Sequence, residues 1–203
     1  MCQYSAVDGV PNDWHLTHYT DIARGGAGLL IVEATGVSAD GRISPGCLGI
    51  WNDVQAAEHK KIASAIKKWG AVPGIQIAHA GRKASANLPW EGDDHIPEGD
   101  PRAWEIIGPS AVAFGGDLPR VPREMTKADI ERVKADFVSA AERALAAGYE
   151  WLELHFAHGY LAQSFFSPHA NKRTDEYGGS AENRGRFLRE TLEAVRKVWP
   201  TNL

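Results

Sequence analysis

The segment LHFAHGY at residues 154–160 places two imidazoles and a phenol, those of His155, His158 and Tyr160, directly after an apolar run that starts at Tyr149. Imidazole donates hydrogen bonds and exchanges protons near neutral pH, and a phenol that is held in place can supply a proton. An apolar run that ends in such residues indicates a buried strand whose end reaches a reactive surface. The alternative is a loop in which these groups only satisfy buried backbone atoms.

Strands and helices alternate along the chain, and they must position that segment. The sequence predicts strands at 29–34, 72–78 and 149–155 and helices at 14–24, 54–69, 127–147 and 181–198. Gly70 and Gly148 act as helix stop signals, and Thr126 is a suitable N-cap. A long loop is predicted between residues 79 and 124, and loops of that length are usually functional or disordered.

Each predicted strand has one apolar face and one polar face. The polar faces carry Glu33, Gln76, Glu153 and His155. A doubly wound sheet buries both faces under helices and favours apolar residues on both. A (β/α)8 barrel instead turns one face inward and forms its site from polar residues near the C-terminal ends of the strands. The predicted fold class is therefore α/β, a partial (β/α)8 TIM barrel.

The number of strands is too small for a complete barrel. Three strands are visible in 203 residues, whereas such a barrel needs eight in about 250 residues. The chain opens in what looks like a strand-to-helix loop and stops just after a helix. We therefore expect residues 1–203 to form the N-terminal half of a single barrel domain, from the loop after strand one to the helix after strand four, with both ends truncated.

Composition argues against several classes of function. The chain is 43% hydrophobic and 24% charged, as in ordinary soluble proteins, and its net charge of −4 indicates no surface for nucleic acid or an anionic membrane. No apolar run approaches the roughly 20 residues that span a bilayer, and no signal peptide is visible. Cys2 and Cys47 are too few for a disulfide framework, which favours a cytoplasmic location.

Several long motifs occur together in order. They are MCQY at 1–4, GLLIVEA at 28–34, GIQIAHAGRK at 74–83, residues 154–161, and NKRTDEYGGS at 171–180 followed by Glu182, Asn183 and Arg184. In these motifs the chain resembles the N-terminal half of an Old Yellow Enzyme, a member of the FMN-dependent ene-reductases. The loop PWEGDDH at 89–95 is similar to that of the bacterial branch that includes the xenobiotic reductases. The resemblance implies an oxidoreductase that passes hydride from NADPH through FMN to an activated alkene.

The resemblance implies cofactor contacts for four residues. Gln76 would pair with the pyrimidine edge of FMN, because a carboxamide offers both a donor and an acceptor. Ala34 would leave room for the flavin ring. Met1 and Cys2 would lie along the flavin, where the thiol tunes its potential, whereas Cys47 lies outside the motifs and is expected to be structural.

The resemblance also implies roles toward the substrate. His155 and His158 would bind the carbonyl oxygen of an enone or related small electrophile and stabilise its developing charge. Tyr160 would deliver a proton to the α-carbon, and Tyr4 would be a substrate-side phenol. The full-length protein is expected to be a homo-oligomer.

Two other interpretations stay open. His79, His155 and His158 at strand ends suit zinc in a metal-dependent barrel hydrolase, although this leaves Gln76 and Tyr160 without a role. Alternatively, the chain is a non-catalytic fragment. The family's arginine from strand five and its phosphate-binding loops after strands seven and eight would then lie outside it.

Overall fold

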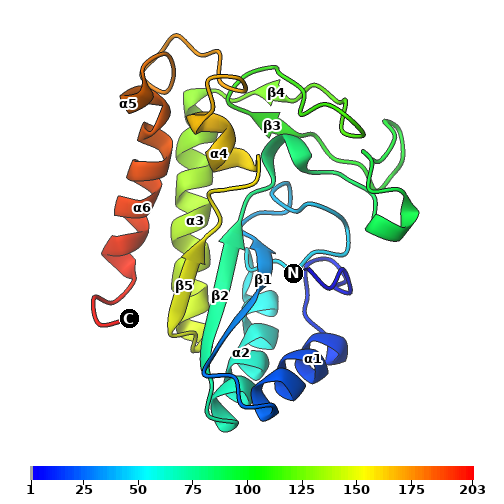
Figure 1. Cartoon of the computed structure of the whole chain (residues 1–203), viewed down its shortest axis with the longest axis vertical. Coiled ribbons are helices and arrows are strands. Elements are labelled where there is room, and N and C mark those ends of the chain that lie inside the picture. Colours follow the sequence, from blue (N-terminus) through cyan, green and yellow to red (C-terminus); the bar gives the residue numbers. More distant parts are fainter. Residues whose placement is uncertain (1) are drawn as a thin grey trace.

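A three-stranded parallel sheet forms the centre of the molecule, and helices pack against it (Figure 1). The computed structural model describes residues 2–203. The strands β1 (Leu29–Gly36), β2 (Val72–Ala78) and β5 (Trp151–Leu154) lie in the order β1-β2-β5. The helices are α1 (Asp13–Arg24), α2 (Asp53–Lys68), α3 (Lys127–Ala147), α4 (Leu161–Phe166), α5 (Ala181–Arg184) and α6 (Arg186–Val198). The predicted alternation of strands and helices is confirmed.

Local sequence explains where the long helices begin and end. Asn12, Asn52 and Thr126 cap α1, α2 and α3, and in each helix the third residue returns a side-chain bond to the cap backbone. These bonds satisfy N–H groups that a helix start otherwise leaves unpaired. Gly148 ends α3 with a φ of 98°, a left-handed conformation that glycine adopts without a steric penalty. None of the helices in the described part of the chain is both long and apolar enough to cross a membrane.

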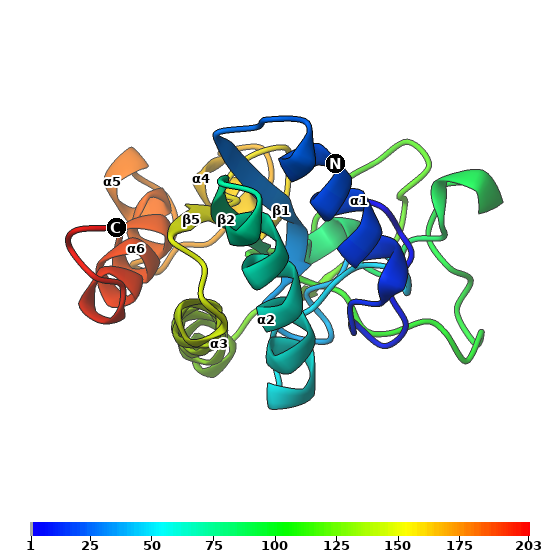
Figure 2. The ribbon, with the colours of Figure 1, turned by 90° about the horizontal axis from the view of Figure 1, so that it is seen from below.

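The core lies between the sheet and the helices on one side of it. Ile75 and Ile77 are fully buried on that side, together with Val32, as the alternation along the strands predicts. Figure 2 shows α2 and α3 on the same side of the sheet. On the opposite face, Leu29 and Trp151 are 41% and 50% exposed. A sheet face that has exposed apolar side chains and no covering layer is the arrangement expected of part of a barrel.

A β-bulge interrupts β1 between Val32 and Thr35. Three steps along β1 there match two steps along β2, so β1 carries one extra residue and the alternation of its side chains reverses beyond that point. Strict alternation would place Ala34 on the helix side with Leu30 and Val32. Because of the bulge, Ala34 lines the open side instead.

The bulge also explains why the prediction for Glu33 is wrong. Glu33 does not join the polar open face. Its buried carboxylate accepts hydrogen bonds from the hydroxyl of Tyr19 on α1 at 2.5 Å and from the backbone N–H of Gln3 at 2.8 Å. Burial raises the pKa of Glu33 above its usual value. Glu33 therefore joins the N-terminal segment and α1 to the sheet.

The segment predicted as a long loop contains short regular elements. These are two 3-10 turns, η1 (Gly81–Lys83) and η2 (Pro89–Glu91), and a small parallel pair, β3 (Ile107–Gly108) with β4 (Arg123–Glu124). This segment extends beyond the C-terminal ends of the central strands (Figure 1). Helix α4 is absent from the sequence-based prediction, and the last predicted helix is divided at Gly185 into α5 and α6.

His59 is a buried histidine that links α2 to two other parts of the fold. Its ring accepts a hydrogen bond from the hydroxyl of Tyr149 at 2.9 Å through Nδ1 and donates one to the carbonyl of Gly49 at 3.2 Å through Nε2. Both ring nitrogens are thus satisfied in the neutral form. Burial lowers the pKa of His59 to about 4.

This shift makes the stability of the fold dependent on pH. Below pH 6.5 His59 becomes protonated in the unfolded state, whereas in the folded state it stays neutral down to about pH 4. The free energy of unfolding therefore decreases as the pH falls through that range. We expect the free energy of unfolding to fall by about 2 kcal/mol more between pH 7 and pH 5 in the parent protein than in a His59→Gln variant. Urea denaturation at the two pH values measures this difference, and parallel curves for the two proteins would contradict it.

Candidate active site

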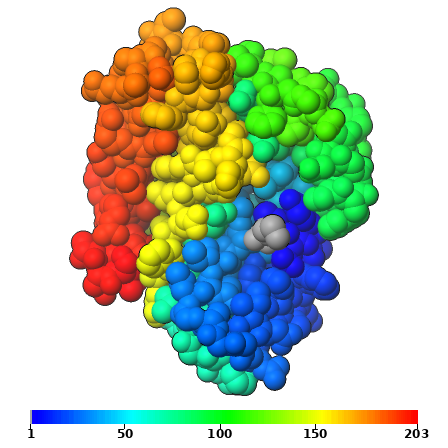
Figure 3. Space-filling model, viewed as in Figure 1, coloured from blue at the N-terminus to red at the C-terminus, as the bar shows by residue number. Residues whose placement is uncertain are grey.

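A cavity of about 440 Å³ lies at the C-terminal ends of the three central strands. It is lined by Cys2, Tyr4, Ala34, Ile43, Gln76, His155, His158 and Tyr160. Every predicted site residue in the described part of the chain therefore lines one cavity, and Met1 lies outside the described residues. The space-filling view shows the N-terminal segment, the segment after β5 and the loop before α3 meeting on one face (Figure 3).

Neighbouring strands bring Gln76 and His155 to the same edge. Gln76 is opposite Glu153 in the parallel pairing of β2 with β5, and its amide donates a hydrogen bond to that carboxylate at 3.0 Å. The ladder continues past β5, because the N–H of His155 donates to the carbonyl of Ile77 at 3.0 Å. Among the described residues, no group donates a hydrogen bond to the side-chain amide oxygen of Gln76. Gln76 thus retains an acceptor and a second N–H beside the cavity.

His155 is held as a neutral donor. Burial lowers the pKa of His155, and the proximity of His158 lowers it further. Its Nδ1 accepts a long hydrogen bond of 3.4 Å from the N–H of Ala157, which leaves the proton on Nε2. The ring packs edge-on against that of His158, with centroids 5.1 Å apart. The two imidazoles can therefore present donors to one ligand atom.

Tyr160 lies against the same ring. The centroids of Tyr160 and His155 are 4.8 Å apart with the rings nearly perpendicular. Burial raises the pKa of Tyr160 to about 12, and the thiols of Cys2 and Cys47 add to the effect. The phenol therefore stays protonated at neutral pH and remains available as a proton donor.

Tyr4 closes the N-terminal side of the cavity. Its φ of 52° lies in the left-handed region, which residues other than glycine rarely adopt. In this conformation the side chain has a different direction from the one it would have in an extended chain. Its ring contacts Trp90 of η2 edge-on, with centroids 6.0 Å apart. Burial raises the pKa of Tyr4 above its usual value, so this phenol is also protonated at neutral pH.

The only two cysteines of the chain interact with each other, which the sequence did not indicate. The hydrogen bond between them raises the pKa of Cys2 and lowers the pKa of Cys47 to about 7. The sulfur of Cys47 is also 3.4 Å from both the N–H and the hydroxyl oxygen of Ser44. The directions of these shifts favour negative charge on Cys47 over Cys2, which lines the cavity wall.

Two further residues adjoin the cavity outside the predicted set. Ile43 lines it from the loop after β1. Lys83 lines a second cavity of about 390 Å³ that shares Tyr4, Ile43 and Tyr160 with the first. The sequence gives no signal for Ile43. Lys83 stands in the GIQIAHAGRK motif, but its spacing does not indicate which side chain it approaches.

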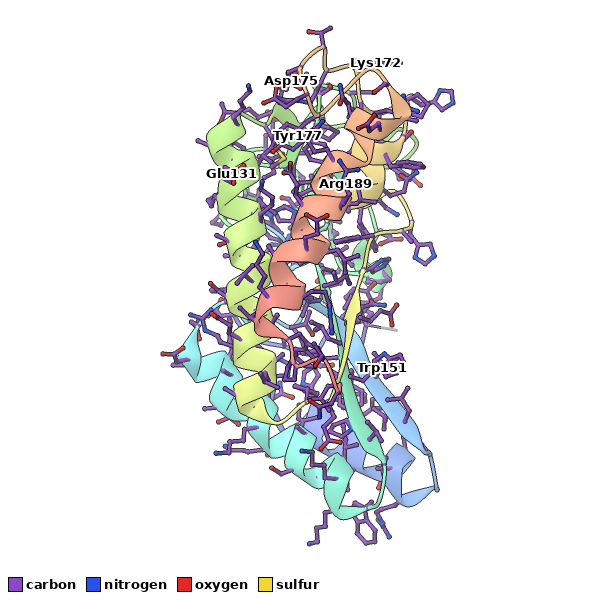
Figure 4. The ribbon with its side chains drawn as sticks, turned by 90° about the vertical axis from the view of Figure 1, so that its left-hand side faces the viewer. Glu131, Trp151, Lys172, Asp175, Tyr177 and Arg189 are labelled. Atoms are coloured by element: carbon purple, nitrogen blue, oxygen red, sulfur yellow. The ribbon has the colours of Figure 1, made fainter. Side chains whose placement is uncertain are left out.

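The loop after α4 is braced by charged and aromatic residues. Arg173 binds Asp175 at 2.6 Å and donates to the carbonyls of Pro109 and Met125. The hydroxyl of Tyr177 is 2.9 Å from a carboxylate oxygen of Glu190 on α6. Figure 4 shows Asp175 and Tyr177 near the upper ends of α3 and α6. These contacts fix the segment that follows the cavity residues.

The histidines of the hydrolase interpretation do not form a ligand set. His79 accepts a hydrogen bond from the N–H of Gly81 through Nδ1, and its Nε2 is 3.9 Å from a carboxylate oxygen of Asp40. In the described part of the chain, no three His, Cys, Asp or Glu side chains are grouped so that they could hold a metal ion. The imidazoles of His155 and His158 instead face a phenol and a carboxamide.

Comparison with known proteins places the chain among flavin-dependent oxidoreductases. It matches the family described as NADH:flavin oxidoreductase / NADH oxidase over residues 1–201. It is 48% identical over 201 residues to the NADPH dehydrogenase of Geobacillus sp. and 46% identical to that of Clostridium acetobutylicum. These alignments cover 98% of this chain and 54% and 55% of the two relatives.

Solved structures give the same result. Morphinone reductase superposes with a TM-score of 0.84 at 31% identity, covering 98% of this chain and 54% of its own. Old Yellow Enzyme from Pichia sp. superposes with a TM-score of 0.84 at 33% identity, covering 98% and 51%. These neighbours confirm both the predicted fold class, part of a (β/α)8 barrel, and the predicted resemblance. The chain spans about half the length of the curated relatives it matches, and it belongs to the NADH:flavin oxidoreductase / NADH oxidase family.

Proposed function

We propose that these residues form the substrate side of an FMN-dependent ene-reductase that uses NADPH as electron donor. The observation that carries the proposal is the shared cavity, in which Gln76 and Ala34 lie together with His155, His158 and Tyr160. Two donors and a protonated phenol can polarise an α,β-unsaturated carbonyl and protonate it during reduction, and a carboxamide with a small residue beside it suits a flavin. The residues form the N-terminal half of a single barrel domain in this proposal.

The residues present fit a flavin. Gln76 has a free acceptor and a free N–H for the alternating acceptors and donor of a pyrimidine edge. Ala34 offers only a methyl group where the bulge turns it toward the cavity, so a planar ring can approach closely. Cys2 lines the same wall. FMN bound there would supply hydride to the β-carbon of the electrophile.

The two imidazoles bind and polarise the substrate in this proposal. His155 presents Nε2–H, and His158 lies beside it in the cavity wall. Both would donate to the carbonyl oxygen, where negative charge accumulates as hydride arrives at the β-carbon. The lowered pKa of His155 matters here, because a neutral imidazole donates its hydrogen bond without giving up its proton.

Tyr160 completes the addition. Its phenol is protonated at neutral pH and lies against His155, so a substrate whose carbonyl binds the imidazoles has its α-carbon near the hydroxyl. Proton transfer to that carbon yields the saturated product. Tyr4 would contact the substrate from the opposite side of the cavity.

Three further features belong to the same proposal. The substrate is a small enone or related electrophile, because the cavity of about 440 Å³ must also hold part of the flavin. The full-length protein acts as a homo-oligomer in the cytoplasm. The free thiols of Cys2 and Cys47 suit a reducing compartment.

The proposal is tested by flavin absorbance and by two histidine variants of the full-length holoprotein. We expect stoichiometric FMN and NADPH-dependent reduction of an enone. His155→Ala or His158→Ala should weaken binding of a phenolic ligand and slow the oxidative half-reaction tenfold or more. One donor to a developing oxyanion is worth roughly 2.7–4 kcal/mol in a well-studied hydrolase.

His169→Ala is the matched control, because His169 is exposed and lies outside the cavity. This variant should bind the phenolic ligand and reduce the enone at the parent rate. Residues 1–203 purified alone without bound FMN would support the alternative of a non-catalytic fragment, whereas a full-length protein that binds no FMN would contradict the proposal. Unchanged enone reduction in both cavity variants would remove the imidazoles from the mechanism.

Cys2 provides a second test, through the flavin potential. Without the hydrogen bond from Cys2, the pKa of Cys47 should rise and its negative charge near the cavity should be lost. Reduction of the flavin then becomes easier. We expect Cys2→Ala to raise the reduction potential by roughly 20 mV, which corresponds to about 1 kcal/mol for a two-electron couple. Dye-coupled titration measures this, and an unchanged potential would limit Cys2 to packing.

A further inference from the structure

Lys83 occupies a position that the proposed chemistry does not use. It is the last residue of η1, the turn that follows β2, and it lines the second cavity beside the candidate active site. Its ammonium group lies over the ring of Phe114 and over the ring of Tyr160, with Nζ 4.6 Å and 4.9 Å from the two centroids. A cation in this position is attracted by the faces of both rings.

The same ammonium group holds the backbone that carries the cavity residues. Nζ of Lys83 donates a hydrogen bond to the carbonyl oxygen of His158 at 3.2 Å. His158 has a φ of 55°, in the left-handed region that non-glycine residues rarely adopt. Such a conformation persists where surrounding contacts stabilise it, and the bond from Lys83 is one of these contacts.

Several charged or titratable groups act on Tyr160 from the surrounding elements. They are Cys2 and Tyr4 in the N-terminal segment, Cys47 in the loop after β1, Lys83 in η1, Asp93 in the long loop and His155 after β5. The thiols and Asp93 disfavour a phenolate. Within residues 2–203, Lys83 is the one cation that lies over the ring of Tyr160.

We propose that Lys83 is a positioning residue for Tyr160, which fixes the turn that carries the phenol and stabilises the phenolate left after proton transfer. The inference rests on the proposed function. In that step the O–H bond of Tyr160 breaks and a C–H bond forms at the α-carbon of the substrate. The electron pair of the O–H bond stays on the phenolate oxygen, the enolate supplies the pair for the new C–H bond, and solvent then reprotonates the phenolate.

The electrostatic part is measured without turnover. In the full-length holoprotein, Tyr160 is replaced by 3,5-difluorotyrosine, whose lower intrinsic pKa brings the titration into an accessible range for ¹⁹F NMR. Lys83→Gln keeps a hydrogen-bond donor and removes the charge, whereas Lys83→Arg keeps the charge. We expect Lys83→Gln to raise the pKa of the fluorinated phenol by about one unit, as for a partly screened charge pair, and Lys83→Arg to leave it near the parent value.

The kinetic part uses the natural phenol. Lys83→Gln should slow enone reduction about tenfold and increase its solvent deuterium isotope effect, because proton transfer becomes more limiting, and Lys83→Arg should recover most of the rate. Lys60→Gln is the control, since Lys60 is exposed on α2. Lys83→Met, which removes both charge and donor, should show the same pKa rise with a larger loss of rate.

Two outcomes separate this inference from the function on which it rests. An unchanged titration in both Lys83→Gln and Lys83→Met would overturn the role of Lys83, whatever the activity. If Tyr160→Phe reduces the enone at the parent rate while the titration still responds to Lys83, the assignment of Tyr160 as proton donor is overturned. The coupling of the two side chains would then have no catalytic use.

Discussion

The parallel pairing of β2 with β5 is the constraint on which the candidate site depends. It places Gln76 opposite Glu153 and carries the ladder on to His155, so that a carboxamide and an imidazole emerge at the same edge of the sheet. Parallel strands bring their C-terminal ends together, and this is why barrel proteins gather reactive groups there. The turn after β5 then needs only a few residues to add His158 and Tyr160 to the same cavity.

The bulge in β1 makes a second adjustment at that edge. The extra residue reverses the sides of the sheet that Glu33 and Ala34 would face under regular alternation. Glu33 is turned toward Tyr19 and Gln3 and ties the N-terminal segment to the sheet. That tie brings Cys2 and Tyr4 to the cavity, while Ala34 keeps the wall beside Gln76 small. A buried carboxylate with two hydrogen bonds thus supports the geometry of the site from behind.

Partial burial sets the protonation of the site. It disfavours charge on His155 and Tyr160, which leaves one as a neutral donor and the other as a protonated acid. The thiols of Cys2 and Cys47 disfavour a phenolate at Tyr160, and in the proposal above the ammonium group of Lys83 over the same ring favours it. The site therefore combines neutral groups that face a ligand with charges placed behind or beside them. Such fixed charges act without reorganisation when charge develops in a reaction.

The sequence alone determined the order of the elements and most residues around the cavity. Period-two alternation in β2 and β5 is local, so it correctly assigned Ile75 and Ile77 to the core and Gln76 to the open face. Thr126 and Gly148 predicted the two ends of α3 for the same reason. The motifs around His155 and Gln76 pointed to one family, and comparison with known proteins confirmed it.

Only the tertiary structure decided what depends on contacts between distant segments. Strict alternation misplaced Glu33, because a bulge arises from pairing with a neighbouring strand and has no local signature. The contact between Cys2 and Cys47 requires the N-terminal segment to pack on the loop after β1. Lys83 reaches Tyr160 only because η1 and the turn after β5 meet beyond the ends of adjacent strands. Electrostatics and hydrogen bonds act through space, so residues far apart in the chain acquire their chemistry from the fold.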